Sequence, residues 1–298
     1  MSTSGAIAAV FVGFVSFAVS YRMGIILIIF YYTGSKITKV REDVKKKLER
    51  DYKVAGQRDA VQVLANSAMA TGVAVLFYLV IGEDKYMVEF GLGQGVRILM
   101  NQDGATEAAR EGLEALRKQI ASYLWAMYVA HYACANGDTW ASELGILSKS
   151  RPRLITSFLL RKEVPKGTNG GVSLEGTLAS ALGGALIGLV FWAMSLFMTF
   201  QRPLGNPAPQ HPMIFVGLVS GLLGSVVDSF LGACLQATYY DFDKKQIVKR
   251  GDFEVGDANV KIIQGIDILS NEAVNFYSIV ITMLLACYIS PTIYALTY

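Results

Sequence analysis

Residues 176–199 read GTLASALGGALIGLVFWAMSLFMT and contain no charged side chain. This stretch is long enough to cross the hydrocarbon core of a bilayer as one helix, which takes about 20 apolar residues. A helix that is apolar on every side must be surrounded by a protein core or by lipid. The stretch predicts a transmembrane helix, and the rest of the chain decides between lipid and core.

Six further apolar stretches favour lipid. They cover residues 5–20, 23–35, 61–82, 119–136, 213–238 and 274–297. Charged residues make up only 17% of the chain, against roughly 25% in soluble domains. The excess of apolar residues must face lipid, so we expect an all-α bundle of about seven spans that forms one domain over residues 1–298. The first two stretches are separated only by Tyr21 and Arg22, which predicts a tight hairpin or one broken helix.

The polar loops indicate the orientation of the bundle. Lysine and arginine concentrate in residues 36–60 and 146–175, and residues 239–273 carry basic side chains among at least as many acidic ones. Seven spans place all three loops on one side, and the basic residues make that side cytosolic. The net charge of +3 is too small to indicate nucleic-acid binding. The bilayer is the expected partner, and the sequence leaves the oligomeric state open.

The motif NGDTWASELG, residues 136–145, carries two acids, Asp138 and Glu143, at the cytosolic end of the span 119–136. A carboxylate within hydrocarbon is costly unless it is paired or binds a cation. Thr139 and Ser142 add further oxygen atoms, and Mg²⁺ prefers oxygen ligands together with substrate phosphates. The motif predicts a metal site, although a helix cap at Asp138 or Thr139 would explain the same residue types.

The motif VPKGTNGGVSLEGTLA, residues 164–179, places a lysine before three glycines. Glycines let backbone N–H groups approach an anion closely, and the lysine adds a positive charge. A helix then begins near Ser173, and helix N-termini attract phosphate. The motif predicts a phosphate-binding loop or, alternatively, a flexible connection before a span. Its candidate residues are Lys166, Gly167, Thr168, Asn169, Gly170, Gly171 and Glu175.

Asp228 lies in the middle of the otherwise apolar span 213–238, which also contains Gly221 and Gly224. A carboxylate in the middle of a span is a functional hypothesis by default, although pairing with an arginine or a backbone donor is the alternative. If Asp228 and Asp138 share a Mg²⁺ ion, this span must pack against the end of the span 119–136. Glycines allow such close helix packing, so we expect them at the contact.

Three more polar residues lie near the same membrane surface. Asn271 and Asn275 are four residues apart at the start of the last span and therefore share a helix face. Their amides can hold a nucleotide or phosphate, or can cap and pack. Arg58 precedes the span 61–82, and its planar guanidinium suits phosphate oxygens.

Together these motifs resemble a family of integral membrane proteins that includes transmembrane protein 19 and plant phytyl-phosphate kinase. The resemblance covers nearly the whole chain. Its most specific parts are KVREDVKKKLERDYKVAGQRDAVQVLANS, GDTWASELG, SRPRLIT, VPKGTNGGVSLEGTLAS and GLLGSVVDSFLGA. A weaker resemblance links the chain to CTP-dependent polyprenol kinases such as dolichol kinase. The residues that carry it are Gly137, Asp138, Ala141, Ser142, Lys166, Ser173, Glu175, Gly176, Thr177 and Ala179.

The resemblance implies CTP as phosphate donor, Mg²⁺ as cofactor and a prenyl alcohol or prenyl phosphate as acceptor. We therefore expect a kinase that converts a prenyl phosphate, such as phytyl or geranylgeranyl phosphate, to the diphosphate at the cytosolic membrane surface. The expected location is the endoplasmic reticulum or the plastid envelope. The alternatives are a polyprenol kinase, a cytidylyltransferase acting on a lipid phosphate, and a non-enzymatic lipid carrier or transporter.

The expected roles divide the candidate residues into three sets. Asp138, Lys166 and Asp228 are the candidate catalytic residues, and Asp138, Glu143 and Asp228 are the candidate Mg²⁺ ligands. The candidates for nucleotide and phosphate binding are Arg58, Lys166, Gly167, Thr168, Asn169, Gly170, Gly171, Glu175, Asn271 and Asn275.

Overall fold

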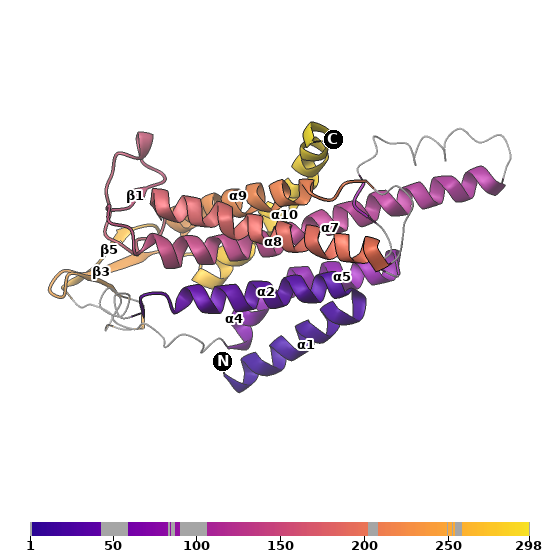
Figure 1. Ribbon diagram of the computed structural model, residues 1–298. Helices are drawn as coiled ribbons and strands as arrows, with labels where there is room; N and C mark the ends of the chain where they lie inside the picture. The colour runs from indigo at the N-terminus through magenta and orange to yellow at the C-terminus, as the bar shows by residue number, and fades with distance from the viewer. Residues whose placement is uncertain are drawn as a thin grey trace.

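The computed structural model describes residues 2–42, 59–82, 84, 87–89, 106–201, 208–248, 250–251, 253 and 258–297. Its α-helices are α1 (Thr3–Val19), α2 (Tyr21–Thr38), α4 (Ala60–Ala65), α5 (Ala68–Val80), α7 (Thr106–Gly145), α8 (Leu174–Gln201), α9 (Pro212–Leu235) and α10 (Asn271–Thr297). The short elements are β1 (Arg153–Leu154), the 3₁₀ turn η1 (Phe158–Leu160), β2 (Gly171–Val172), β3 (Thr238–Asp241), β4 (Gln246–Val248) and β5 (Val260–Gln264). Figure 1 shows a bundle of helices with the strands gathered at one end.

The first two helices form the expected hairpin. Ser20 separates α1 from α2 and has an extended backbone, with φ −159° and ψ 135°. Its side chain accepts a hydrogen bond from the backbone N–H of Arg22 at 3.1 Å. This bond satisfies one of the free N–H groups at the start of α2, which is why the helix begins again immediately.

The expected number of about seven spans is not confirmed. Among the described residues, three helices are long and apolar enough to cross a bilayer, namely Leu174–Phe200 within α8, α9 and α10. Two shorter helices there, α1 and α5, are also apolar. The stretch 61–82 is divided between α4 and α5 at Asn66 and Ser67. With 13 residues, α5 extends for about 20 Å, whereas a bilayer core is about 30 Å thick.

Helix α7 is the centre of the bundle. The stretch 119–136 forms the inner part of this 40-residue helix, which packs against α2, α5, α8, α9 and α10. The buried ring of Trp125 contacts the ring of Phe77 on α5 and that of Phe191 on α8, with centroids 5.5 and 5.1 Å apart. Such edge-on aromatic contacts fix the position of α7, and with it the position of the acids at its C-terminal end.

Glycines bring α7, α8 and α9 close together, as the sequence predicted for the contact between α7 and α9. A Cβ atom at Gly137 of α7 would lie 2.8 Å from the carbonyl oxygen of Ser180 and 2.9 Å from Cα of Gly221. At Gly224 it would meet the side chain of Cys134. A larger residue would push the helices apart, so the glycine contact determines how near the two helix ends come.

The polar segments at the strand-bearing end contain small sheets, so the described chain is mostly but not wholly α-helical. Strand β1 pairs with β2 in antiparallel fashion, with Leu154 opposite Gly171. Strand β3 lies between β4 and β5, also antiparallel, within the segment 239–273 that we expected to be a loop. These strands have only two to five residues, too few to give a clear alternation of apolar and polar residues.

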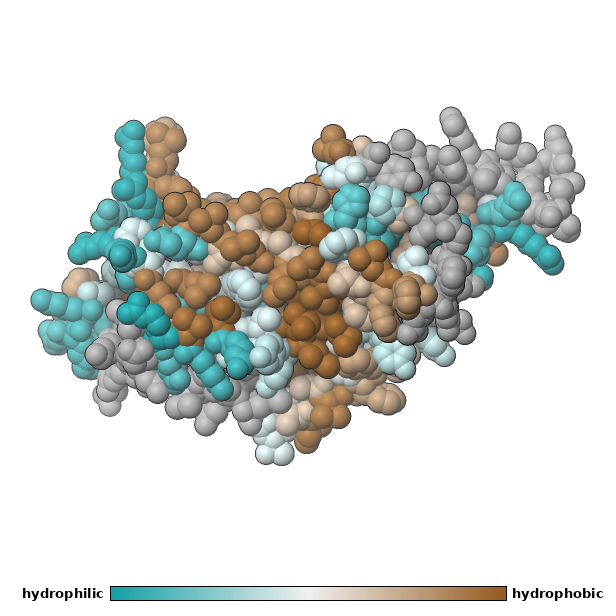
Figure 2. Space-filling model, in the orientation of Figure 1, coloured by the Kyte–Doolittle hydropathy of each residue, from teal (hydrophilic) through white to brown (hydrophobic). Residues whose placement is uncertain are grey.

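The segments 146–175 and 239–273 leave the bundle at the end where α2 finishes (Figure 1). This agrees with their expected placement on one side of the bundle. The third basic loop, residues 36–60, is described only at residues 36–42 and 59–60. Figure 2 shows hydrophobic side chains over the helices and hydrophilic groups toward the two ends. That distribution is typical of a protein whose middle section is surrounded by the hydrocarbon core of a bilayer. Which end faces the cytosol stays a prediction.

Candidate functional site

A pocket of about 850 Å³ lies at the strand-bearing end of the bundle. Its wall combines the ends of α2, α7 and α9, helix α4, the starts of α8 and α10, and strand β3. The loop between β1 and α8 forms a further part of the wall, from Lys166 to Ser173. Segments far apart in the sequence therefore meet around one polar cavity at the mouth of apolar helices.

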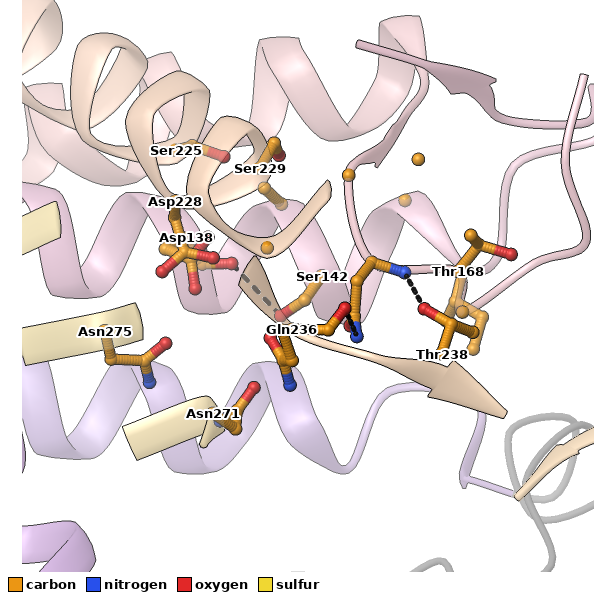
Figure 3. Close-up of a pocket in the computed structure, with 18 of the residues that line it drawn as sticks. Asp138, Ser142, Thr168, Ser225, Asp228, Ser229, Gln236, Thr238, Asn271 and Asn275 are labelled. Carbon is orange, nitrogen blue, oxygen red and sulfur yellow. Dashed lines mark hydrogen bonds between the residues drawn. The ribbon is translucent and has the colours of Figure 1, made fainter. Parts of the chain in front are cut away.

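Two carboxylates lie close together in this wall, Asp138 of α7 and Asp228 of α9 (Figure 3). They are near enough for their charges to repel each other. The side chain of Ser278 donates a hydrogen bond to Oδ2 of Asp228 at 3.1 Å. The amide of Asn275, oriented with its nitrogen toward the same oxygen, donates another at 3.1 Å. The Asp228 carboxylate is therefore oriented by two neutral groups of α10.

No basic side chain neutralises this pair within the part of the chain that the structure describes. The ion pairs found there join Arg22 to Asp84, Lys244 to Asp241 and Arg250 to Asp267. Pairing of Asp228 with an arginine, the structural alternative raised by the sequence, is therefore not seen among those residues. Two like charges at the edge of the membrane are costly together, so the pair favours neutralisation, either by a shared proton or by a bound cation.

Lys166 borders the pocket, and its ammonium group caps the end of α7. Its Nζ donates hydrogen bonds to the carbonyl oxygen of Ile146 at 3.1 Å and to that of Ser148. A positive charge at a helix C-terminus is favourable because the free carbonyls there carry partial negative charge. An ammonium group has three N–H donors, so one remains for a ligand in the pocket.

The glycine-rich loop is held by α9 and β3. Gly170 has φ +77°, and a Cβ atom there would lie 2.8 Å from the carbonyl oxygen of Ser229. Glycine is therefore required at this position for close packing on α9, whether or not an anion binds. The backbone N–H of Asn169 donates to Oγ1 of Thr238 at 3.1 Å, and the N–H of Gly171 donates to the carbonyl oxygen of Thr168 at 2.9 Å.

These hydrogen bonds reduce the number of backbone N–H groups that the loop can offer to an anion. The N–H of Thr168 is also engaged, by the carbonyl oxygen of Pro165 at 3.2 Å. Three of the expected anion donors are thus used to shape the loop itself. Among the residues that the structure describes, the N–H groups of Gly167 and Gly170 have no hydrogen-bond acceptor, which leaves these two for a ligand.

The structure brings most of the predicted site residues into one wall. The predicted residues that line the pocket are Asp138, Glu143, Lys166, Gly167, Thr168, Asn169, Gly170, Gly171, Asp228, Asn271 and Asn275. Glu175 does not, because it lies exposed on the first turn of α8. Arg58 lies outside the described residues.

The expected metal site of three carboxylates stays a prediction, and the structure shows how its members lie. No three acids, histidines or cysteines among the described residues lie close enough together to hold a metal ion. Glu143 follows Asp138 by five residues on α7, which turns its side chain away from the face that meets α9. The described site therefore offers Asp138 and Asp228 as a pair.

Several pocket residues were missed by reasoning from the sequence. Ser225 and Ser229 lie within one turn of Asp228 on α9, and Gln236 and Thr238 follow the end of that helix (Figure 3). Gln62 of α4 lines the pocket as well. A serine three residues before Asp228 was a usable signal, because residues at that spacing share a helix face. The residues of β3 gave no such signal.

The charged side chains that line the pocket are mainly acidic. Five acids and two bases belong to the described wall: Asp138, Glu143, Asp228, Asp267, Glu272, Lys166 and Arg250. Arg250 is already paired with Asp267. A polyphosphate without a cation would meet net repulsion here, so these residues suit a phosphate compound that arrives with a metal ion.

Comparison with known proteins gives one family match over most of the chain. A family model described as "Integral membrane protein DUF92" matches residues 1–283. "Protein PGR" of Arabidopsis thaliana is 36% identical over 295 residues, which is 99% of this chain and 90% of that protein. No solved structure matches.

Two further relatives are more distant. "Protein VTE6, chloroplastic" of Arabidopsis thaliana is 25% identical over 237 residues, covering 79% of this chain and 56% of that protein. An uncharacterized membrane protein of Methanocaldococcus jannaschii is 38% identical over 119 residues, covering 39% of this chain and 43% of that protein.

Proposed function

We propose that the pocket of this chain, which belongs to the DUF92 family of integral membrane proteins, is the active site of a lipid phosphotransferase. The reaction we propose is the transfer of a phosphoryl group from CTP, assisted by Mg²⁺, to a prenyl phosphate at the cytosolic membrane surface. The observation that carries the proposal is the carboxylate pair of Asp138 and Asp228, which faces a polar pocket at the mouth of apolar helices.

The pair suits Mg²⁺ better than other roles. Mg²⁺ is commonly bound by one or two carboxylates together with substrate phosphates and water, rather than by a full set of protein ligands. The two acids that lie together in the described pocket wall fit that pattern. When bound, the ion would neutralise charge on the transferring phosphate. Asp138 and Asp228 would hold it, and Ser278 and Asn275 would keep Asp228 in place.

The donors that remain unused around the pocket would hold the phosphates of the nucleotide. They are the third N–H of Lys166 and the backbone N–H groups of Gly167 and Gly170. Asn271, at the start of α10, adds a side-chain amide in the same wall (Figure 3). Arg58 stays a candidate from the sequence alone.

The proposed step needs little proton chemistry. An oxygen of the acceptor phosphate, already ionised at neutral pH, attacks the γ-phosphorus of CTP. The bond from that phosphorus to the β–γ bridging oxygen breaks, and CDP leaves. Phosphoryl transfer depends mainly on positioning and on charge neutralisation, which Lys166 and a Mg²⁺ ion held by the two acids would supply. The prenyl tail would lie between the apolar helices beside the pocket.

The choice of this chemistry comes from the motifs and not from the names of relatives. Those names state no reaction. The motifs GDTWASELG and VPKGTNGGVSLEGTLAS, which resemble segments of phytyl-phosphate kinase and polyprenol kinases, supply Asp138 and Lys166 to one pocket. We also propose the endoplasmic reticulum or the plastid envelope as location, which a fluorescent fusion of the full chain would test.

Product analysis tests the proposal. Purified protein in lipid nanodiscs is incubated with Mg²⁺ and CTP labelled in either the α or the γ phosphate, against prenyl alcohols and prenyl phosphates. The proposed kinase transfers only the γ label and yields prenyl diphosphate and CDP. Transfer of the α label with release of pyrophosphate indicates a cytidylyltransferase. If no acceptor is turned over, and a separately labelled prenyl lipid in the nanodisc still moves from one leaflet to the other, the result indicates a carrier.

A further inference from the structure

The segment from Arg151 to Val164 forms a hairpin that projects from the strand-bearing end of the bundle (Figure 1). Its two arms are joined by backbone hydrogen bonds from Leu154 to Lys162 at 2.9 Å and from Val164 to Pro152 at 3.0 Å. Ser157 closes the turn, because its Oγ accepts from the N–H of Lys162 at 3.2 Å. The hairpin is therefore a hydrogen-bonded element with a defined backbone and not an irregular loop.

The base of the hairpin is fixed to the bundle. Leu154 and Val164 are buried against Ala233 of α9, and the N–H of Ile155 donates to the carbonyl oxygen of Gly170 at 2.9 Å. The depth of the hairpin tip relative to the helices is consequently set by the fold.

The tip carries three consecutive apolar residues in contact with solvent. The exposed fractions are 79% for Phe158, 67% for Leu159 and 40% for Leu160. Single apolar residues on a protein surface need no explanation, but a run of three at a projecting tip does. Leu159 and Leu160 also have φ values of 51° and 52°, a left-handed backbone that leucine rarely adopts. Neither core packing nor backbone preference accounts for these side chains, which leaves a contact outside the chain as their explanation.

Basic residues flank the apolar tip. Arg151, Arg153, Arg161 and Lys162 are all exposed, against one exposed acid in the hairpin, Glu163. The guanidinium of Arg161 lies 5.8 Å from the ring centroid of Phe158. Apolar side chains beside lysine and arginine are typical of segments that lie in the headgroup region of an anionic membrane.

The position of the hairpin relative to the helices supports the same partner. Figure 1 shows it projecting sideways near the start of α8. The first turns of α8 expose Leu174, Leu178 and Leu182, by 72%, 56% and 62%, on a helix apolar enough to cross a membrane. In Figure 2 the projection is hydrophobic on the side toward the helices and hydrophilic on the side away from them. A bilayer around the helices would therefore meet the apolar side of the tip.

We propose that the hairpin Arg151–Val164 is an interfacial membrane anchor. Phe158, Leu159 and Leu160 enter the boundary between headgroups and acyl chains of the anionic leaflet, while Arg153, Arg161 and Lys162 contact its phosphates. The occupant of this surface is the lipid of the bilayer that holds the protein. The inference does not depend on the proposed phosphotransferase activity.

A fluorescent label at the tip tests the contact directly. The label, nitrobenzoxadiazole, is attached at Leu159→Cys in a chain carrying Cys234→Ser and Cys287→Ser, since the remaining Cys134 is buried. The matched control is Phe242→Cys, which is 52% exposed in the turn after β3. The full chain is placed in bilayers of phosphatidylcholine with phosphatidylserine, and quenching is measured with spin-labelled lipids and with aqueous iodide.

We expect lipid quenching to be at least about threefold stronger at Leu159→Cys than at Phe242→Cys, because a side chain at the acyl boundary leaves water. Iodide should show the reverse order. Equal lipid quenching at the two positions, with iodide reaching both, overturns the proposal and points to a protein partner for the tip. Adding Arg161→Glu and Lys162→Glu should weaken lipid quenching in the anionic bilayers. Unchanged quenching would overturn the assignment of these two residues to the headgroups.

Discussion

Two clusters of charged groups lie at opposite ends of the same bundle, and they are completed in different ways. At the start of α2, the buried guanidinium of Arg22 donates to Asp84 and, at 3.1 Å, to the hydroxyl of Ser195. It also lies 4.2 Å from the ring centroid of Trp125. At the other end, Asp138 and Asp228 face each other with only neutral groups donating to Asp228.

The difference separates a structural cluster from one that we propose to be functional. In the Arg22 cluster opposite charges and hydrogen bonds compensate for burial, so the group holds α2, α7 and α8 together without any ligand. In the Asp138 pair like charges repel, so the arrangement is unfavourable until a proton or a cation neutralises part of the charge. The same membrane protein thus contains one acid whose charge is compensated within the fold and a pair of acids whose charge is not.

The largest effect expected from this comparison is on activity. Asp228→Asn keeps the volume of the side chain and an oxygen that can accept from Ser278, but removes the charge that would balance Mg²⁺. We expect turnover to be abolished while the unfolding temperature stays equal or rises, since repulsion from Asp138 is removed. Turnover of labelled CTP and thermal unfolding in detergent measure the two outcomes. Normal turnover by the well-folded variant would remove Asp228 from the site.

The opposite cluster should respond in the opposite way. Arg22→Leu leaves Asp84 buried without its charge partner, and we expect a loss of about 3–5 kcal/mol in the free energy of unfolding. Activity per folded molecule should stay unchanged. The double variant Arg22→Leu with Asp84→Leu should recover much of that stability. If Arg22→Leu unfolds like the wild type, this ion pair is not what stabilises the end of the bundle.

The glycine contact links the two regions, and its loss should have an intermediate effect. A Cβ atom at Gly221 would lie 2.5 Å from the carbonyl oxygen of Ser180 and 2.7 Å from Cα of Gly184. Gly221→Ala should therefore cost about 1–3 kcal/mol of stability and also lower turnover, because α9, which carries Asp228, is pushed away from α8. Gly72→Ala is the matched control, since no atom lies within 4 Å of its Cβ position. Equal stability and turnover in the two variants would contradict the close packing of these helices.

The most local of the expected effects concerns Lys166, where one contact to the nucleotide is removed. Lys166→Ala should weaken CTP binding by roughly tenfold or more, as a charge-assisted contact to phosphate is worth about 1.5–3 kcal/mol. Lys261→Ala serves as control, because Lys261 is exposed on β5 and does not line the pocket. Equilibrium binding of CTP to the two variants gives the comparison. Unchanged affinity in Lys166→Ala would leave its carbonyl contacts at the end of α7 as its only role.

The sequence was most informative at residues whose placement within a membrane span is energetically costly. Asp228 within an apolar span and the glycines around it predicted the contact between α7 and α9 that the structure contains. Asp138, Lys166, Asn271 and Asn275 were likewise found in one wall. These residues are unusual for their surroundings, and that is a local property that one sequence can reveal.

Features that depend on distant partners could not be predicted in the same way. Arg22 and Asp84 are 62 residues apart, and only the fold shows that they pair. The exposure of Glu175 depends on which face α8 turns to the pocket. The sheet of β3, β4 and β5 is built from strands too short to show a period. In each case the contact is made by residues whose neighbours in the sequence show no unusual composition or spacing.

The central claim is that Asp138 and Asp228 together bind a divalent cation beside the nucleotide. The most direct measurement is Mn²⁺ binding, as a substitute for Mg²⁺, followed by electron paramagnetic resonance in the presence of CTP. The wild type and the control Asp241→Asn, an acid of β3 outside the pocket wall, should bind Mn²⁺ with equal affinity. Asp228→Asn should weaken this binding by at least about tenfold. Equal Mn²⁺ affinity in all three proteins would contradict the assignment of the carboxylate pair as a metal site.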